Sequence, residues 1–244
     1  MATLYIVATP IGNLKDITLR AIETLKEVDF ILCEDTRITK KLLNCYQIEK
    51  PTISYHQHSQ LRRVNEILEL LRQGKDLALV SDAGTPGIAD PGGKLIEEVV
   101  LTLGQTVNII PIPGPMAVTV AISVSGFPAN KFFFAGFPPS KNKRKKFFEE
   151  IAQFNYPVVF FESPYRIIKT LTELKALTPQ RKIVICQELT KKFETIYRGN
   201  TEEILKQLEI IKVLPKKLKG EFTIVLAGTE RNELTRFHKK KDSR

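Results

Sequence analysis

The chain has 244 residues, of which 43% are hydrophobic and 26% are charged, and its formal net charge is +10. This length allows two domains of roughly 100–150 residues each, and the hydrophobic content is sufficient for packed cores, which excludes a disordered protein. No apolar stretch reaches the roughly 20 residues of a membrane-spanning helix, and the N-terminus lacks the basic flank of a signal peptide.

The first half of the chain alternates short apolar runs with longer segments of helical period. The runs that predict strands are Leu4–Ala8, Phe30–Cys33, Ile53–Tyr55, Leu77–Ser81 and Val107–Ile110. The segments that predict helices are Thr18–Val28, Thr39–Tyr46, Leu61–Gln73 and Pro91–Leu103. This alternation predicts an α/β domain with a mainly parallel sheet.

A second α/β pattern follows the small and β-branched residues of the predicted helix Met116–Val124. Its predicted strands are Phe132–Ala135, Val158–Phe161, Ile183–Cys186, Thr195–Arg198 and Phe222–Ala227. Its predicted helices are Lys143–Gln153, Pro164–Leu177 and Thr201–Ile211. We therefore expect an N-terminal α/β domain over residues 1–117, a C-terminal α/β domain over 118–229 and a basic, polar tail over 230–244.

The positive charge is confined to the second half. Residues 1–117 carry 12 Lys and Arg against 14 Asp and Glu, whereas residues 118–244 carry 25 against 13. A net charge of +12 on one half predicts that this half binds a polyanion, although a basic surface can also serve solubility alone.

Three predicted strands are followed by Gly-rich or charged loops, and α/β sheets bind ligands at the carboxyl ends of their strands. The first loop, Thr9–Leu14, is neither a Rossmann fingerprint nor a P-loop, and it is equally compatible with a plain tight turn. The second, Cys33–Arg37, offers Glu34 and Asp35 as proton acceptors and Arg37 as a phosphate ligand; Asp35 could instead cap a helix.

The third loop, Ser81–Gly93, gives the strongest signal for a ligand site. It holds four glycines and two prolines, which make an extended segment with little side-chain bulk. Such a loop lets a ligand approach backbone N–H and C=O groups closely, and long ordered loops are usually functional. A second rigid turn, Pro111–Ala117, follows the next predicted strand.

The segment Ser140–Lys146 contains five basic residues. Such a run is usually a solvated helix start, but basic residues are unfavourable near a helix N-terminus, and their presence there suggests a polyanion target. The predicted RNA-contacting residues are Lys141, Lys143, Arg144, Lys145, Lys146 and, from a later motif, Arg166.

Neither the cysteines nor the histidines predict a metal site. Cys33, Cys45 and Cys186 are odd in number and lack metal-ligand spacing, so we expect free thiols, the first and last buried, in a reducing cytoplasm. His56 and His58 lie two residues apart on a predicted loop without a third ligand nearby, which favours substrate hydrogen bonding or a capping turn over metal binding.

Six motifs occur in a fixed order: Thr9–Leu14, Glu34–Arg37, Ser81–Gly87, Pro113–Pro115, Gly136–Phe137 and Glu162–Arg166. Over about residues 3–228 they resemble the tetrapyrrole methylase superfamily, and within it the bacterial cytidine 2′-O-methyltransferases of small-subunit ribosomal RNA. The resemblance implies two α/β domains with the cofactor cleft between them, a homodimer, and cytidine in the decoding region of 16S rRNA within the small ribosomal subunit as substrate.

The resemblance also implies S-adenosylmethionine as cofactor. The implied cofactor-binding residues are Pro10, Asp82, Ala83, Gly84, Thr85, Gly87, Ile88, Pro113, Gly114, Ala117, Phe137, Ala227 and Gly228. Asp35 or Glu34 is the candidate base for the ribose hydroxyl, with Arg37 positioning a phosphate. Competing interpretations are a methyltransferase acting on a small tetrapyrrole and a non-catalytic RNA-binding protein.

Three positions depart from the family pattern. His56–Gln60 lacks the acidic residues expected there, Tyr165 stands where a histidine is expected before Arg166, and few residues follow Gly228. We therefore expect the Lys-rich tail to take over any RNA docking by a C-terminal extension, or that docking to be absent.

Overall fold

The computed structural model describes residues 1–56, 61–213 and 218–229, and it divides at Met116–Ala117 into two compact units. Among these residues no helix is long and apolar enough to cross a membrane. Part of the loop that carries the predicted histidine pair, His58 included, and the basic tail over 230–244 lie outside the described residues.

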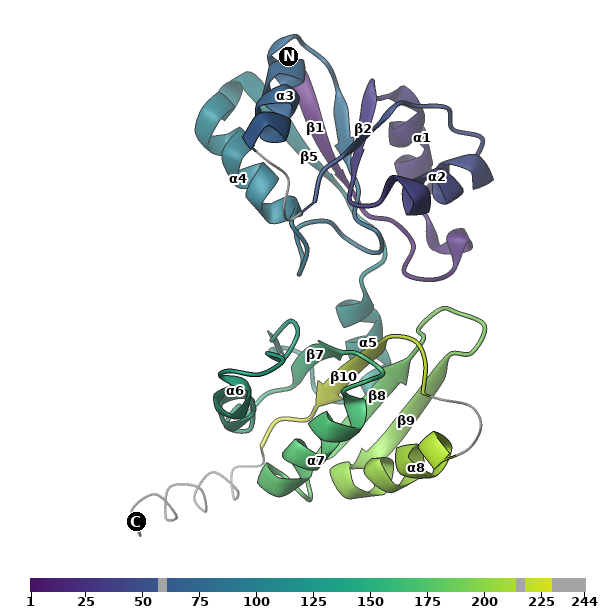
Figure 1. Ribbon diagram of the computed structural model, residues 1–244, viewed down its shortest axis with the longest axis vertical. Coiled ribbons are helices and arrows are strands. Elements are labelled where there is room, and N and C mark those ends of the chain that lie inside the picture. Colours follow the sequence, from purple (N-terminus) through teal and green to yellow (C-terminus); the bar gives the residue numbers. More distant parts are fainter. Residues whose placement is uncertain (57–60, 214–217, 230–244) are drawn as a thin grey trace. The chain divides into compact units, whose positions relative to one another are not determined.

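The first unit is built on a five-stranded parallel sheet with strand order β3-β2-β4-β1-β5 (Figure 1). The strands are β1 (Ala2–Val7), β2 (Phe30–Cys33), β3 (Thr52–Ser54), β4 (Leu77–Leu79) and β5 (Val107–Ile112). The helices are α1 (Leu19–Glu27), α2 (Thr36–Cys45), α3 (Leu61–Arg72) and α4 (Gly92–Leu103), with 3-10 turns η1 (Leu14–Asp16) and η2 (Gly104–Thr106). The predicted parallel α/β architecture is confirmed.

Alternate residues of the strands face two separate cores. Val7, Ile31 and Val80 pack under α1 and α2, whereas Leu4 and Leu77 pack under α3 and α4. Figure 1 shows the two helix pairs on opposite faces of this sheet. Right-handed crossovers explain why the helix pairs lie on opposite faces. The chain moves along the sheet toward β3 after β1 and β2, and it moves back toward β5 after β3 and β4, so the connecting helices change face.

This topology positions the ligand loops. The adjacent strands β1 and β4 lead into α1 and α4, which lie on opposite faces of the sheet, so the strand order reverses between them. The carboxyl ends of the strands at such a reversal are where open α/β sheets bind ligands.

The second unit contains a mixed sheet with order β6-β7-β10-β8-β9, in which β6 pairs parallel with β7 and the other pairs are antiparallel. Its strands are β6 (Phe133–Phe134), β7 (Val158–Glu162), β8 (Lys182–Gln187), β9 (Thr195–Asn200) and β10 (Phe222–Leu226). Its helices are α5 (Ala117–Ser125), α6 (Arg144–Ile151), α7 (Ile167–Leu177) and α8 (Thr201–Val213).

A single large core lies between this sheet and α6, α7 and α8. Phe148, Leu171 and Leu208 from the three helices meet Phe160 and Ile224 from the strands, and all five are buried. Helix α5 packs on β7 and β10 from the other face. The sheet is therefore covered on both faces, as its apolar strands require.

Candidate functional site

Loops that follow β1, β4 and β5 meet at the carboxyl edge of the parallel sheet. Thr9 and Gly84 exchange two backbone hydrogen bonds, with N···O distances of 2.9 and 3.1 Å, and so form a bridge between the β1 and β4 loops. The Thr85 hydroxyl donates to the Pro115 carbonyl, 3.2 Å away, which ties the β4 loop to the β5 loop. The loops that follow β1, β4 and β5 are thus one hydrogen-bonded unit.

The Ser81–Gly87 loop is rigid at its base and exposed at its tip. The buried Ser81 hydroxyl donates to the Ala83 carbonyl at 3.2 Å, and the buried Thr9 hydroxyl donates to the Ser81 carbonyl at 3.2 Å. Asp82 and Ala83, by contrast, are exposed. The loop therefore presents backbone and small side chains to solvent from a fixed position.

Gly84 has a backbone conformation that side chains rarely adopt, with φ of +84°. A Cβ at this position would also lie 3.4 Å from the Ile11 side chain and 3.6 Å from the Pro115 carbonyl. The positive φ favours glycine here, whereas an added Cβ would meet its neighbours at ordinary van der Waals distances.

Asp90 also shapes this site, although it was not among the predicted site residues. Its carboxylate accepts hydrogen bonds from the backbone N–H groups of Gly87, at 2.8 Å, and Gly92, at 2.7 Å. It thereby closes the Gly87–Ile88 turn against the start of α4. The signal was present in the sequence, because Asp is the residue type that most readily bonds backbone N–H groups ahead of a helix.

Carboxylates accumulate beside this loop, at the end of β2. The Asp35 N–H donates to the Asp82 carboxylate at 3.0 Å. Burial raises the pKa of Glu34, and the negative charges of Asp82 and Asp90 raise it further. Burial also raises the pKa of Asp82. This edge is consequently suited to a positively charged ligand, which would relieve the repulsion among the carboxylates.

Asp35 and Arg37 form an ion pair that also caps α2. The Asp35 carboxylate accepts from the Arg37 backbone N–H at 2.8 Å and pairs with the exposed Arg37 guanidinium at 2.6 Å. These bonds lower the pKa of Asp35 to about 2. A carboxylate so strongly stabilised as an anion is a weak proton acceptor, so of the two candidate bases Glu34 is the better suited.

The remaining cofactor candidates of the first unit lie beside the same loops. Pro10 is buried in the loop after β1, and Pro113 and Gly114 are exposed directly after β5. A Cβ on Gly114 would approach the Ala8 side chain to 3.0 Å, so glycine lets the β5 loop lie against the end of β1. Ala117, the last residue of this predicted group, begins α5 in the second unit.

Besides Ala117, three further cofactor candidates belong to the second unit. Phe137 is largely exposed, and its ring contacts that of Phe161 with 5.2 Å between centroids. Ala227 and Gly228 follow β10, where a Cβ on Gly228 would lie 2.5 Å from the Asn155 carbonyl. A larger residue at 228 would therefore displace the strand end.

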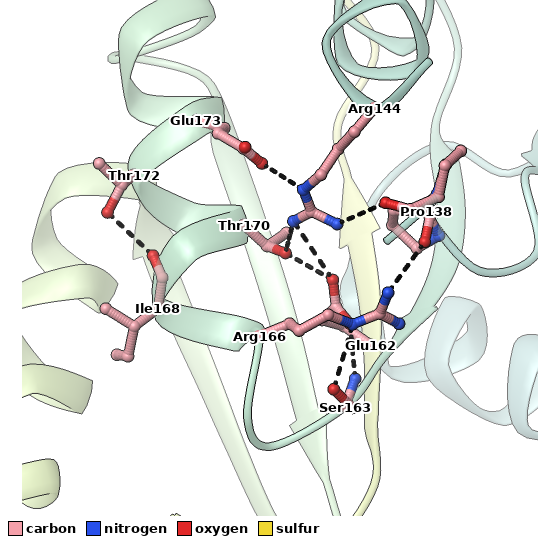
Figure 2. Close-up of polar contacts among 10 residues, drawn as sticks. Pro138, Arg144, Glu162, Ser163, Arg166, Ile168, Thr170, Thr172 and Glu173 are labelled. Atoms are coloured by element: carbon pink, nitrogen blue, oxygen red, sulfur yellow. Dashed lines mark hydrogen bonds and ion pairs between the residues drawn. The ribbon is translucent and has the colours of Figure 1, made fainter. Parts of the chain in front are cut away.

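The predicted basic run is exposed at Lys141, Lys143, Lys145 and Lys146, but the prediction of a surface role is wrong for Arg144. Arg144 is only 4% exposed. Its guanidinium donates to Glu173 at 2.8 Å and to the Thr170 hydroxyl at 2.6 Å, and it lies 3.6 Å from the buried Glu162 (Figure 2). A buried guanidinium whose donors are occupied cannot serve as a surface phosphate ligand.

Arg166 belongs to the same network. Its guanidinium pairs with Glu162 at 2.8 Å and donates to the Pro138 carbonyl at 3.2 Å, and its side chain keeps 28% exposure. It lies where Figure 2 shows the start of α7 meeting the Pro138 segment.

The described residues contain no group of three or more His, Cys, Asp or Glu side chains that could hold a metal ion. Cys33 and Cys186 are free and buried, as predicted, and Cys45 is free and exposed. Burial raises the pKa of Cys186 to about 11, so this thiol is not a nucleophile at neutral pH.

Residues 3–205 match the model of the tetrapyrrole (corrin/porphyrin) methylases. The chain is 45% identical over 230 residues to a Thermotoga maritima protein named Ribosomal RNA small subunit methyltransferase I, a match that covers 94% of this chain and all of the relative. A Bacillus subtilis protein of the same name is 40% identical over 96% of this chain and 78% of its own length. The chain belongs to the tetrapyrrole methylase family. Within that family it groups with the relatives that carry this name, which makes it a methyltransferase and confirms the resemblance found in its motifs.

Solved structures agree on the fold. A cobalt precorrin-4 methyltransferase superposes with a TM-score of 0.64 at 20% identity, covering 93% of this chain and 94% of its own. A diphthine synthase superposes with a TM-score of 0.67 at 14% identity, covering 96% and 94%. At such identities the likeness is one of fold, and substrate choice has to be argued from the residues.

Proposed function

We propose that this protein transfers a methyl group from S-adenosylmethionine to the ribose 2′-hydroxyl of a cytidine in the decoding region of 16S rRNA. The observation that carries the proposal is identity of 40–45% to proteins named Ribosomal RNA small subunit methyltransferase I over nearly the whole chain. The concentration of positive charge in the second half supports a nucleic-acid substrate over a small tetrapyrrole.

The loops at the parallel sheet suit S-adenosylmethionine in shape and charge. Asp82, Ala83, Gly84, Thr85, Gly87 and Ile88 would hold it from the β4 loop, with Pro10, Pro113, Gly114 and Ala117 from neighbouring segments. Phe137, Ala227 and Gly228 of the second unit remain proposed contacts. When bound, this cofactor supplies an activated methyl group on a positively charged sulfur, and the acidic edge formed by Glu34, Asp82 and Asp90 favours such a cation.

Glu34 is the residue we assign to the proton of the ribose hydroxyl. A ribose hydroxyl is a poor nucleophile until it loses its proton, and a carboxylate with a raised pKa accepts a proton more readily than one with a lowered pKa. Asp35 then holds the start of α2 and orients Arg37, whose exposed guanidinium would contact a phosphate of the substrate.

The exposed lysines Lys141, Lys143, Lys145 and Lys146 would bind phosphates of the RNA. The proposed partner is the small ribosomal subunit, encountered in the cytoplasm by a homodimer of this chain. Sedimentation of the purified protein at the mass of two chains would support the dimer, and sedimentation as a single chain would rule it out.

The test is incorporation of the labelled methyl group of S-adenosylmethionine into three acceptors: purified small ribosomal subunits that lack the modification, naked 16S rRNA, and a tetrapyrrole. The proposal expects incorporation into small subunits. Incorporation into the tetrapyrrole alone would assign the alternative substrate class, and binding of RNA without transfer to any acceptor would make the chain an RNA-binding protein.

A further inference from the structure

Tyr165 is the most exposed aromatic residue among those that the structure describes. Its relative exposure is 95%, so the ring contributes almost nothing to the core that β7 and α7 share. It stands in the turn that joins these two elements. Burying an aromatic ring is favourable, and a ring held entirely in solvent is therefore a candidate for contact with a partner.

The turn that carries Tyr165 is held by one buried carboxylate. Glu162, at the end of β7, accepts from the Ser163 N–H at 2.7 Å and pairs with Arg166 at 2.8 Å. The backbone closes in the same place, since the Arg166 N–H donates to the Ser163 carbonyl at 3.1 Å. The backbone on both sides of Tyr165 is consequently held by these bonds, and Figure 2 shows the side-chain contacts of Glu162, Ser163 and Arg166.

The same carboxylate holds the lysine-bearing segment beside this turn. Arg144 lies 3.6 Å from Glu162 and donates to the Pro139 carbonyl at 3.1 Å, while Arg166 donates to the Pro138 carbonyl at 3.2 Å. Lys141 and Lys143 lie between these anchored points and are exposed. The turn and both ends of the lysine segment are therefore joined through Glu162 and its two arginines, and their exposed residues are considered together as one surface.

The charge of this surface comes from lysines and not from the two arginines. Arg144 and Arg166 are paired with Glu173 and Glu162. The exposed cations are Lys141, Lys143, Lys145, Lys146 and Lys169; Lys145 makes one contact, of 3.8 Å, to Glu149. We call Tyr165 together with Lys141 and Lys143 the tyrosine–lysine surface.

We propose that the tyrosine–lysine surface binds an unpaired stretch of RNA, with one base stacked on the Tyr165 ring and the phosphates beside Lys141 and Lys143. This inference rests on the proposed function for its RNA substrate and adds where, and in which form, the RNA is held. An exposed ring can stack on a base only where that base is not already stacked in a duplex, and lysines attract the backbone without regard to sequence. An aromatic ring on a surface that also carries lysines thus favours single strands.

The test is fluorescence anisotropy of the full chain with three probes: an unstructured 12-nucleotide oligoribonucleotide, the duplex of the same sequence, and heparin as a polyanion without bases. Stacking on one aromatic ring changes affinity for single strands about tenfold, so Tyr165→Ala is expected to weaken oligoribonucleotide binding by that factor. Tyr165→Phe keeps the ring and should stay within about twofold. Lys141→Gln with Lys143→Gln should weaken all three probes and lower the single-strand salt slope by about 1.4.

Phe193→Ala supplies a matched control, because Phe193 is 72% exposed and has a lysine beside its ring but lies in the β8–β9 connection. The proposal expects it to bind like the wild type. The proposal is overturned if the wild type does not bind the oligoribonucleotide, if Tyr165→Ala binds it normally, if Tyr165→Ala weakens duplex and heparin equally, or if Phe193→Ala causes the same loss. Methyl transfer by the wild type to small subunits is measured in parallel, so that failure of the surface is distinguished from failure of the proposed function.

Discussion

Each unit holds a cluster of carboxylates and arginines, and the two clusters have opposite environments. In the first unit Asp35 pairs with Arg37 at the surface, where the guanidinium is 87% exposed. In the second unit Glu162 is fully buried between Arg144 and Arg166. An exposed pair exchanges its partner for a ligand at little cost, whereas a buried pair that loses one member leaves a desolvated charge behind. The first cluster is therefore available for chemistry, and the second holds the fold.

The largest effect is expected from removing Glu162. Glu162→Ala leaves the buried Arg144 guanidinium without its deepest partner, and breaking a buried pair from one side costs about 3–5 kcal/mol in the free energy of unfolding. Urea unfolding followed by circular dichroism measures this loss. Asp35→Ala is the control and should shift the urea midpoint of unfolding far less. Equal shifts for the two variants would show that the buried cluster stabilises the fold no more than the exposed one.

The next effect concerns the proton acceptor in the exposed cluster. If Glu34 accepts the hydroxyl proton, Glu34→Gln should lower kcat on the order of 100-fold with S-adenosylmethionine binding retained. Asp35→Asn is the matched control, because Asn still caps α2 and the carboxylate that it replaces has a pKa of about 2. We expect it to keep kcat within about threefold. Normal turnover by both variants would contradict any base in this cluster.

The pH dependence distinguishes the two carboxylates without a mutation. Only the deprotonated form of a base accepts a proton, so activity falls as the pH drops toward the pKa of the base. Because burial raises the pKa of Glu34, the acidic limb should lie above the ordinary pKa of a glutamate. A profile that stays flat toward pH 3 in a folded enzyme would point to Asp35, whose pKa is lowered to about 2.

A smaller effect is expected at the Gly84 bridge. Gly84→Ala places a side chain at φ of +84° in the bridge to Thr9, and relief of this backbone strain should shift the loop and weaken S-adenosylmethionine binding about tenfold in a calorimetric titration. Gly74→Ala is a matched control, since φ is +81° there and nothing lies within 4 Å of the added Cβ. Equal loss of affinity in both variants would mean that backbone strain in general, and not the bridge, is responsible.

The smallest effect is expected from Arg37. Arg37→Gln should weaken binding of small subunits about threefold and reduce the salt slope by about one, because it removes one phosphate contact. Lys40→Gln changes another exposed cation on the same helix and should alter both quantities less. If the salt dependence of small-subunit binding is unchanged in Arg37→Gln, Arg37 does not contact a phosphate.

The sequence predicted the elements of both units well, because most carry a clear period and are bounded by Gly, Pro or a capping residue. The helix predicted over Thr39–Tyr46 begins at Thr36 instead, since Asp35 caps it. The mixed sheet of the second unit could not be read from its apolar runs, because a buried strand looks the same in either direction.

The candidate sites were harder to predict, because burial depends on partners that are distant in sequence. Arg144 stands among lysines in the chain, yet its partners Glu162 and Glu173 come from β7 and α7. The β4 loop was predictable from its own glycines, whereas the pKa difference between Glu34 and Asp35 depends on Asp82, Asp90 and Arg37 around them.

The measurement that tests the proposed reaction most directly is nucleoside analysis of small subunits after reaction with the protein and S-adenosylmethionine. Unmodified subunits are incubated with the wild type or with Glu34→Gln, and the 16S rRNA is digested and examined by mass spectrometry. We predict that 2′-O-methylcytidine appears and approaches one per subunit with the wild type. With Glu34→Gln it should form far more slowly. A methyl group found on a base, or no gain of methylated nucleoside, would contradict it.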